Sequence, residues 1–232
     1  MTSRFHSFSN GPALAEGLAD AVAAALSKAI AERGKASLVV SGGSTPKAFF
    51  KALSTRDIAW DKVIVTLVDE RFVPADNPRS NHQLVADNLL QNVAARAQFM
   101  PLYHAAATAA EAAVIATRET AAIGCPFDVA ILGMGTDGHT ASFFPGGTNL
   151  AQALSAGTPR SVIEMEAEGA GEPRLTFTFS SLQDAGLLVL HIEGQGKKDV
   201  LDRANETGEE TDMPIRAMLR RAETPIDIYW AP

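Results

Sequence analysis

Asp137 and His139 lie two residues apart in a glycine-flanked segment, GMGTDGH (133–139), that directly follows an apolar run typical of a buried strand. An imidazole titrates near neutral pH, so a histidine in such a loop can act as a general base. Asp137 could orient the imidazole ring or the substrate. The pattern therefore indicates proton transfer, although a single Asp-x-His in a loop is a weak motif by itself.

A second glycine-rich segment consists of Ser41, Gly42, Gly43, Ser44 and Thr45, between a predicted strand and a predicted helix. Glycines let backbone N–H groups approach an anion, the hydroxyls add donors, and a helix N-terminus adds a positive dipole. The segment lacks the Gly-Lys-Ser/Thr of a Walker loop and the Gly-x-Gly-x-x-Gly spacing of dinucleotide sites. It therefore predicts a site for a single phosphate, with a tight turn carrying exposed hydroxyls as the structural alternative.

Four cationic side chains stand near the ends of predicted elements. Arg71 follows Asp69-Glu70 at the end of a strand, and Arg79 lies further along the same loop. Arg174 and Lys197 stand near a strand and a helix start. Guanidinium groups pair with phosphate or carboxylate at two points. Each of the four could instead be a surface ion pair or a solvated side chain.

Strands alternate with helices along the whole chain. We predict buried strands over 38–40, 63–68, 127–132, 187–192 and 226–230, a half-exposed strand over 175–179, and helices after Asn10, Pro46, Ser80, Thr108, Gly194 and Pro214. This order predicts an α/β fold, a single Rossmann-like domain over residues 1–232 with a mostly parallel sheet and helices on both faces. Ligands bind where the carboxyl ends of such strands meet. We therefore expect the loops that begin at residues 41, 69, 133 and 194 to converge.

Composition excludes several classes of protein. The 232 residues are 46% hydrophobic and 20% charged, which excludes a disordered chain, and the net charge of −7 argues against a broad nucleic-acid surface. The single cysteine, Cys125, excludes an intrachain disulfide, fits a reducing compartment and is predicted to be a small packing residue. Apolar runs fall short of the ~20 residues of a membrane span, and Glu16 and Asp20 interrupt the alanine-rich stretch near the start. We expect a cytoplasmic protein with no membrane association.

The other histidines do not suggest a metal. No second histidine accompanies His139 at a metal-ligand spacing, so we predict no metal site. His191 lies inside an apolar strand and is predicted to be a hydrogen-bonded core histidine. His82, in the helix after Arg79, is predicted to be structural or to face the rim of the site.

Together these segments resemble the signatures of the 6-phosphogluconolactonase family, which shares its fold with the glucosamine-6-phosphate isomerases. The matching segments, in order, are SGGSTP (41–46), VDERFVP (68–74), Ser80-Asn81, LGMGTDGHTASFFPG (132–146), PRLT (173–176) and the Gly-x-x-Lys that ends at Lys197. The resemblance extends from about residue 40 to the final helix. It implies hydrolysis of 6-phospho-D-glucono-1,5-lactone to 6-phosphogluconate, the second step of the oxidative pentose phosphate pathway, without a cofactor.

The resemblance also implies a role for each site residue. His139 would be the catalytic base, assisted by Asp137, and Arg71 would face the lactone end of the sugar. The residues on the substrate-binding side would be Ser41, Gly42, Gly43, Ser44, Thr45, Asp69, Arg174 and Lys197, with Arg79 as an additional phosphate contact. The partner would be a small sugar-phosphate lactone, and the chain a monomer or weak homo-oligomer.

Two alternatives follow from the same motifs. Glucosamine-6-phosphate deaminases share the phosphate loop and the Asp-x-His, but have a glutamate five residues after the histidine and a tyrosine after Asp-Glu. This chain has Phe144 and Arg71 at those positions, which favours the lactonase. A non-catalytic sugar-phosphate-binding domain is the other alternative, against which the Asp137–His139 pair argues.

Overall fold

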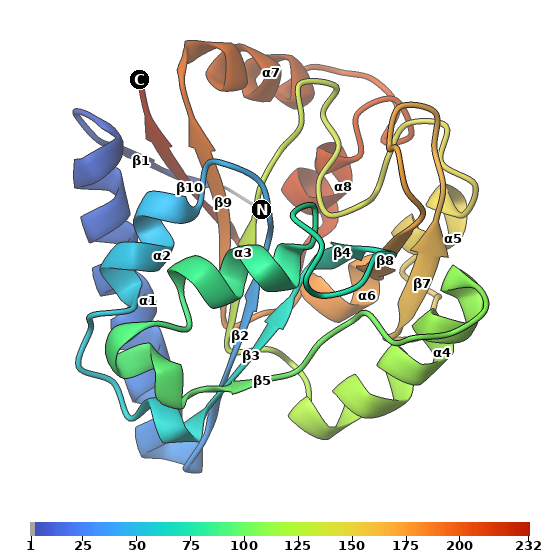
Figure 1. Ribbon diagram of the computed structural model, residues 1–232. Coiled ribbons are helices and arrows are strands. Elements are labelled where there is room, and N and C mark those ends of the chain that lie inside the picture. Colours follow the sequence, from blue (N-terminus) through green and yellow to red (C-terminus); the bar gives the residue numbers. More distant parts are fainter. Residues whose placement is uncertain (1–2) are drawn as a thin grey trace.

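Seven strands form a sheet in which every neighbouring pair runs parallel, in the order β1-β10-β9-β6-β2-β3-β5 (Figure 1). The structure is a computed structural model that describes residues 3–232. The strands are β1 (Arg4–Ser7), β2 (Ala36–Val40), β3 (Val63–Leu67), β5 (Gln98–Phe99), β6 (Val129–Leu132), β9 (Leu187–Glu193) and β10 (Ile226–Ala231). The central strands are buried throughout, as a parallel sheet covered on both faces requires.

Helices flank this sheet. Figure 1 shows α1 and α2 on the left of the sheet and α4, α5 and α8 on its right. The helices are α1 (Gly11–Arg33), α2 (Lys47–Leu53), α3 (Asn81–Asn88), α4 (Ala109–Thr120), α5 (Leu150–Leu154), α6 (Phe179–Leu182), α7 (Gln195–Asn205) and α8 (Ile215–Arg221). Short 3₁₀ turns lie at Trp60–Lys62, Asn92–Arg96 and Ala121–Ile123. The predicted α/β class, with a mostly parallel sheet and helices around it, is confirmed.

The first helix begins where the sequence predicts, directly after Asn10. The Asn10 side chain caps it by accepting a hydrogen bond from the backbone N of Ala13, at 2.9 Å. Gly34 ends it in the left-handed conformation, with φ at +77°. One stripe of side chains, Leu14, Leu18, Val22 and Leu26, is fully buried against the sheet. Their spacing of four residues places them on the same face of the helix.

A second, smaller sheet differs from the prediction. It contains β4 (Asp69–Arg71), β8 (Arg174–Phe177) and β7 (Val162–Met165), which are antiparallel and in the order β4-β8-β7. The expectation that 175–179 is a half-exposed strand is wrong, because β8 is buried along its length. Thr176, which gave the alternating pattern, is satisfied inside the protein: its hydroxyl lies 3.3 Å from the backbone N of Ser142.

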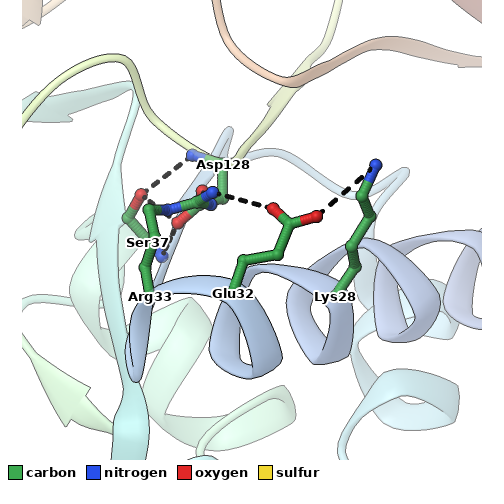
Figure 2. A network of polar contacts seen from close by, with 5 residues as sticks. All are labelled: Lys28, Glu32, Arg33, Ser37 and Asp128. Carbon is green, nitrogen blue, oxygen red and sulfur yellow. Dashed lines mark hydrogen bonds and ion pairs between the residues drawn. The ribbon is translucent and has the colours of Figure 1, made fainter.

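The amino ends of β2 and β6 are joined by a polar network (Figure 2). The Asp128 carboxylate accepts hydrogen bonds from the Ser37 backbone N at 2.7 Å and the Ser37 hydroxyl at 3.1 Å. It also pairs with Arg33 at the end of α1, which contacts Glu32, and Glu32 in turn faces Lys28. This network lies at the amino edge of the sheet, away from the carboxyl ends where the predicted loops emerge.

Cys125 lies near this edge and corrects a prediction. It is exposed rather than packed, because it lies in the turn before β6 enters the core. No helix between residues 3 and 232 combines the length and the apolar character that crossing a membrane requires.

Candidate active site

A cavity of about 380 Å³ lies where the carboxyl ends of the strands meet. Its size is within the range of small-molecule sites. The residues that line it are Ser41, Gly42, Gly43, Ser44, Thr45, Pro46, Asp69, Arg71, Asn81, Gly133, Met134, Gly135, His139, Ala141, Phe144, Gly169, Ala170, Arg174, His191, Ile192 and Lys197. The predicted convergence of the loops after β2, β3, β6 and β9 is therefore confirmed.

His139 and Asp137 form a close pair at this cavity. The Nδ1 atom of His139 lies 2.6 Å from Oδ1 of Asp137, and the same oxygen accepts from the His139 backbone N at 3.1 Å. Asp137 does not itself line the cavity. Burial raises the pKa of Asp137, but the charge of His139 and hydrogen bonds from its backbone and ring oppose burial, and the pKa is lowered overall. The carboxylate therefore stays ionised beside the imidazole.

The backbone under this pair has no room for a side chain. The Gly135 backbone N donates to the His139 carbonyl at 2.8 Å, and the Gly138 N donates to the Gly135 carbonyl at 3.2 Å. A Cβ on Gly135 would overlap the His139 ring and the Asp137 carboxylate. The close contact between Asp137 and His139 therefore requires glycine at position 135.

Lys197 enters the cavity from the first turn of α7. Its Nζ donates a hydrogen bond to the Met134 carbonyl at 2.7 Å, so the lysine contacts the same loop that carries His139. Burial lowers the pKa of the Lys197 ammonium, and the charge of Asp137 opposes this effect in part. A partly buried cation with two further donor positions can bind an anionic group.

Asp69 and Arg174 are both buried and carry opposite charges that act on each other. The Asp69 Oδ2 accepts from the Ser142 hydroxyl at 2.6 Å, which fixes the carboxylate. Arg174 donates from Nη2 to the Ala170 carbonyl at 2.6 Å, while its Nε has no partner among residues 3–232. Burial lowers the pKa of Arg174, and the charge of Asp69 opposes that shift. The guanidinium keeps donor capacity for a ligand.

Glu70 holds the neighbouring backbone in place without reaching the cavity. Its carboxylate accepts from the backbone N of Arg71 at 2.7 Å, of Asn81 at 2.7 Å and of His82 at 2.8 Å, and from the Ser80 hydroxyl at 2.9 Å. Burial raises the pKa of Glu70, and these hydrogen bonds oppose the rise. Glu70 thereby joins β4 to the start of α3 beside Arg71.

Arg79 lies outside the cavity, unlike the other three predicted cations. It does not line the cavity, and its side chain, 55% exposed, forms an ion pair with Glu172, with Nε 2.7 Å from Oε1. Its carbonyl accepts a hydrogen bond from Nη1 of Arg71, which does line the cavity. The phosphate contact of Arg79 stays a prediction.

Several cavity residues were missed by sequence reasoning. Asn81 donates from Nδ2 to the Asp69 carbonyl at 2.8 Å, and the Phe144 ring lies 4.5 Å from the His139 ring and 5.4 Å from the Arg174 guanidinium. His191 is buried as predicted and lies 3.1 Å from Glu193, but it also lines the cavity, and its Nδ1 has no partner in the described part of the chain. Asn81 and Phe144 both lie in segments that match the family signatures and could have been found from them, whereas His191 lies among apolar strand residues and carries no such signal.

Within residues 3–232, no group of three or more His, Cys, Asp or Glu side chains is placed to hold a metal ion. The cavity instead combines the His139 imidazole, which pairs with Asp137 behind the lining, with several cations and hydroxyls. This arrangement suits an anionic substrate that undergoes proton transfer.

Comparison with known proteins decides the family. Residues 9–230 match the model of the glucosamine-6-phosphate isomerases/6-phosphogluconolactonase family. The chain belongs to this family. A 6-phosphogluconolactonase of Rhizobium meliloti is 69% identical over 232 residues, covering 100% of both chains, and one of Mesorhizobium japonicum is 52% identical, covering 98% of this chain and 95% of the relative. The crystal structure of a 6-phosphogluconolactonase from Shewanella baltica superimposes with a TM-score of 0.96 at 40% identity, covering 99% of this chain and 98% of the other.

The family predicted from the motifs is therefore confirmed, and with it the prediction that the chain is an enzyme. The relatives that match over nearly all of both chains carry the name 6-phosphogluconolactonase. Phe144 stands five residues after His139, where the deaminase motif has a glutamate. The ring of Phe144 lies directly beside His139 and has no group that transfers protons.

Proposed function

We propose that this chain hydrolyses 6-phospho-D-glucono-1,5-lactone to 6-phospho-D-gluconate, in the oxidative pentose phosphate pathway. The observation that carries the proposal is the Asp137–His139 pair at a cavity that also contains the Ser41–Thr45 loop and Lys197. The names of the relatives support the same reaction. No cofactor takes part in this hydrolysis.

His139 acts as the general base. Because Asp137 pairs with Nδ1, that nitrogen carries the proton and Nε2 keeps its lone pair. Nε2 takes a proton from water as the water oxygen bonds to the lactone C1. The bond between C1 and the ring oxygen then breaks, and the imidazolium returns the proton to that oxygen. A lactone is an activated ester, so no covalent intermediate is needed.

The cations divide between the two ends of the substrate. The Ser41–Thr45 loop, Lys197 and Arg174 bind the phosphate, and Asp69 accepts hydrogen bonds from sugar hydroxyls. Arg71 faces the lactone end, where it or backbone N–H groups stabilise the negative charge that develops on the carbonyl oxygen. These roles agree with the placement of all five around the one cavity.

The decisive experiment is a coupled assay on freshly generated lactone, with spontaneous ring opening subtracted. The wild-type chain should turn over the lactone, and His139→Asn should lower kcat about 10²–10⁴-fold with nearly unchanged affinity for 6-phosphogluconate. Unchanged turnover in His139→Asn would refute the base assignment. An ammonia-release assay with glucosamine 6-phosphate should be negative; release of ammonia would favour the deaminase.

The cytoplasmic location and the monomer or weak homo-oligomer remain predictions. The first follows from the cysteine usage and a metabolic role, and the second accompanies the family resemblance.

A further inference from the structure

Of the four predicted cations, Arg79 is the one that does not line the cavity, and its side chain contacts Glu172 instead. Its guanidinium pairs with Glu172 through Nε and Oε1, at 2.7 Å. The Glu172 side chain is only 23% exposed, and its second oxygen, Oε2, is buried and has no partner in the described residues. Arg79 is therefore the ion-pair partner that neutralises a largely buried carboxylate.

Glu172 belongs to a segment, residues 166–173, that forms one wall of the cavity. Gly169 and Ala170 of this wall segment line the cavity directly. Hydrogen bonds hold its two ends: the Thr148 backbone N donates to the Glu166 carbonyl at 2.9 Å, and the Phe72 backbone N donates to the Pro173 carbonyl at 2.8 Å. Between these ends, within residues 3–232, the Arg79–Glu172 contact is the one ion pair that the wall segment makes.

The same wall segment holds Arg174, a cation of the cavity. Arg174 donates to the Ala170 carbonyl at 2.6 Å, so the position of Ala170 sets the direction of this guanidinium. Gly171 makes room for the ion pair, since a Cβ at this residue, which has φ at +80°, would lie 2.9 Å from Nη2 of Arg79. A second cation is connected as well, because the Arg79 carbonyl accepts from Nη1 of Arg71.

We propose that Arg79 is a positioning residue that acts through Glu172. It holds the wall segment against the loop after β4, and thereby places Ala170 and Arg174 for the phosphorylated substrate, instead of contacting the phosphate itself. The proposal rests on the proposed function in one respect, that the cavity binds a sugar phosphate. The size of the expected effect separates the two roles. Losing a partly exposed ion pair should raise KM about two- to fivefold, whereas losing a direct arginine–phosphate contact should raise it about tenfold or more.

A double-mutant cycle tests this coupling. KM and kcat for the lactone, and the dissociation constant of 6-phosphogluconate, are measured for Arg79→Ala, Glu172→Ala and the double variant. We expect each single variant to raise KM and the dissociation constant by the same small factor with kcat within twofold, and the double variant to be no weaker than either. Arg79→Lys, which retains the charge opposite Glu172, should recover most of the affinity. Independent effects of the two substitutions, or a loss above tenfold for Arg79→Ala, would overturn the proposal in favour of a direct contact.

A second measurement does not depend on catalysis. Amide hydrogen exchange over residues 167–172 is followed without ligand in wild type, Arg79→Ala and the control Arg160→Ala, which breaks the surface pair of Arg160 with Asp184. Exchange in the wall segment should accelerate in Arg79→Ala alone. Unchanged exchange would overturn the positioning role. If the wild-type chain neither hydrolyses the lactone nor binds 6-phosphogluconate, the proposed function fails, and the exchange experiment still decides whether Arg79 holds this wall.

Discussion

The Oδ1 atom of Asp137 lies 2.6 Å from Nδ1 of His139 and also accepts a hydrogen bond from the backbone N of His139. One carboxylate oxygen thus fixes both the orientation of the ring and the direction in which the chain leaves the turn. Because Nδ1 makes this contact, Nε2 is the ring nitrogen to which the proposed mechanism assigns the proton transfer.

Replacing Asp137 with Asn should therefore impair catalysis more than binding. An amide cannot stabilise the imidazolium, and its NH₂ group can favour the wrong tautomer. We expect kcat to fall about 10²–10⁴-fold, as for loss of the base itself, while the dissociation constant of 6-phosphogluconate changes little. Asp212→Asn, at an exposed aspartate of the loop before α8, serves as the matched control. A kcat equal to wild type in Asp137→Asn would contradict the pairing as a catalytic device.

The lowered pKa of Asp137 also fixes the sign of a pH effect on stability. A carboxyl whose pKa is lower in the folded than in the unfolded state stabilises the fold above the unfolded value, about 3.9, and this contribution disappears as the pH falls through the folded value. Urea unfolding of wild type and Asp137→Asn should therefore differ more at pH 5 than at pH 2.5. A difference that grows toward acid would mean that the sign is wrong.

Deprotonation of Lys197 should weaken the binding of phosphate ligands at alkaline pH. Its ammonium must be protonated to bind phosphate, and burial lowers its pKa below the ordinary value of 10.5. Because the phosphate remains a dianion above pH 7, the dissociation constant of 6-phosphogluconate should rise at alkaline pH, before an ordinary lysine would titrate. Calorimetric titrations of 6-phosphogluconate from pH 7 to 10.5 measure this rise in the dissociation constant directly. Lys197→Arg should remove this rise, because arginine stays charged, whereas Lys198→Arg, at a lysine whose Nζ pairs with Asp202, should retain it.

Glu70→Gln should destabilise the fold. Four donors converge on the two carboxylate oxygens, and an amide offers one acceptor oxygen and an NH₂ group that faces donors. We expect a loss of about 1–3 kcal/mol in the free energy of unfolding, with Tm lower by about 2–4 °C for each kcal/mol. Thermal unfolding beside the exposed control Glu209→Gln checks this. Equal Tm values for the two variants would show that the four hydrogen bonds contribute nothing net.

The network at the opposite edge of the sheet should affect stability without affecting turnover. Asp128→Ala leaves the backbone N of Ser37 without its acceptor and removes one of the two carboxylates that Arg33 contacts. We expect a loss of about 1–3 kcal/mol in the free energy of unfolding and an unchanged kcat, because this edge is the far end of β2 and β6 from the cavity. A large fall in kcat at a temperature where Asp128→Ala is fully folded would show coupling between the two edges.

The large sheet and the convergence of its loops could be predicted because both follow from local patterns. Apolar side chains at every fourth residue, Leu14, Leu18, Val22, Leu26 and Ile30, predict α1, and short apolar runs predict the buried strands. The small sheet could not be predicted in the same way. Its first strand, Asp69–Arg71, has three residues, all charged, and a single residue separates it from the end of β3, so it has no period of its own.

The candidate site was predictable where chemistry lies in one loop and not where it depends on distant partners. Asp137 and His139 are two residues apart, so the sequence already places them together. Ser142 and Asp69 are 73 residues apart, and only the packing of β4 on β8 brings the hydroxyl to the carboxylate. The ion pair of Arg79 could not be predicted either, because its partner, Glu172, belongs to a different part of the chain.

The bare backbone at position 135 has a consequence for how this enzyme can change. In a library of all single substitutions, we expect no replacement at Gly135 to retain turnover, since even one methyl group would overlap the His139 imidazole, the proposed base. Two residues earlier, a Cβ on Gly133 would lie 3.5 Å from the Ser41 hydroxyl, an ordinary packing distance, so alanine should be accepted there. Two glycines of one loop should thus differ in their tolerance to mutation, because only at position 135 does the imidazole occupy the space that a Cβ would need.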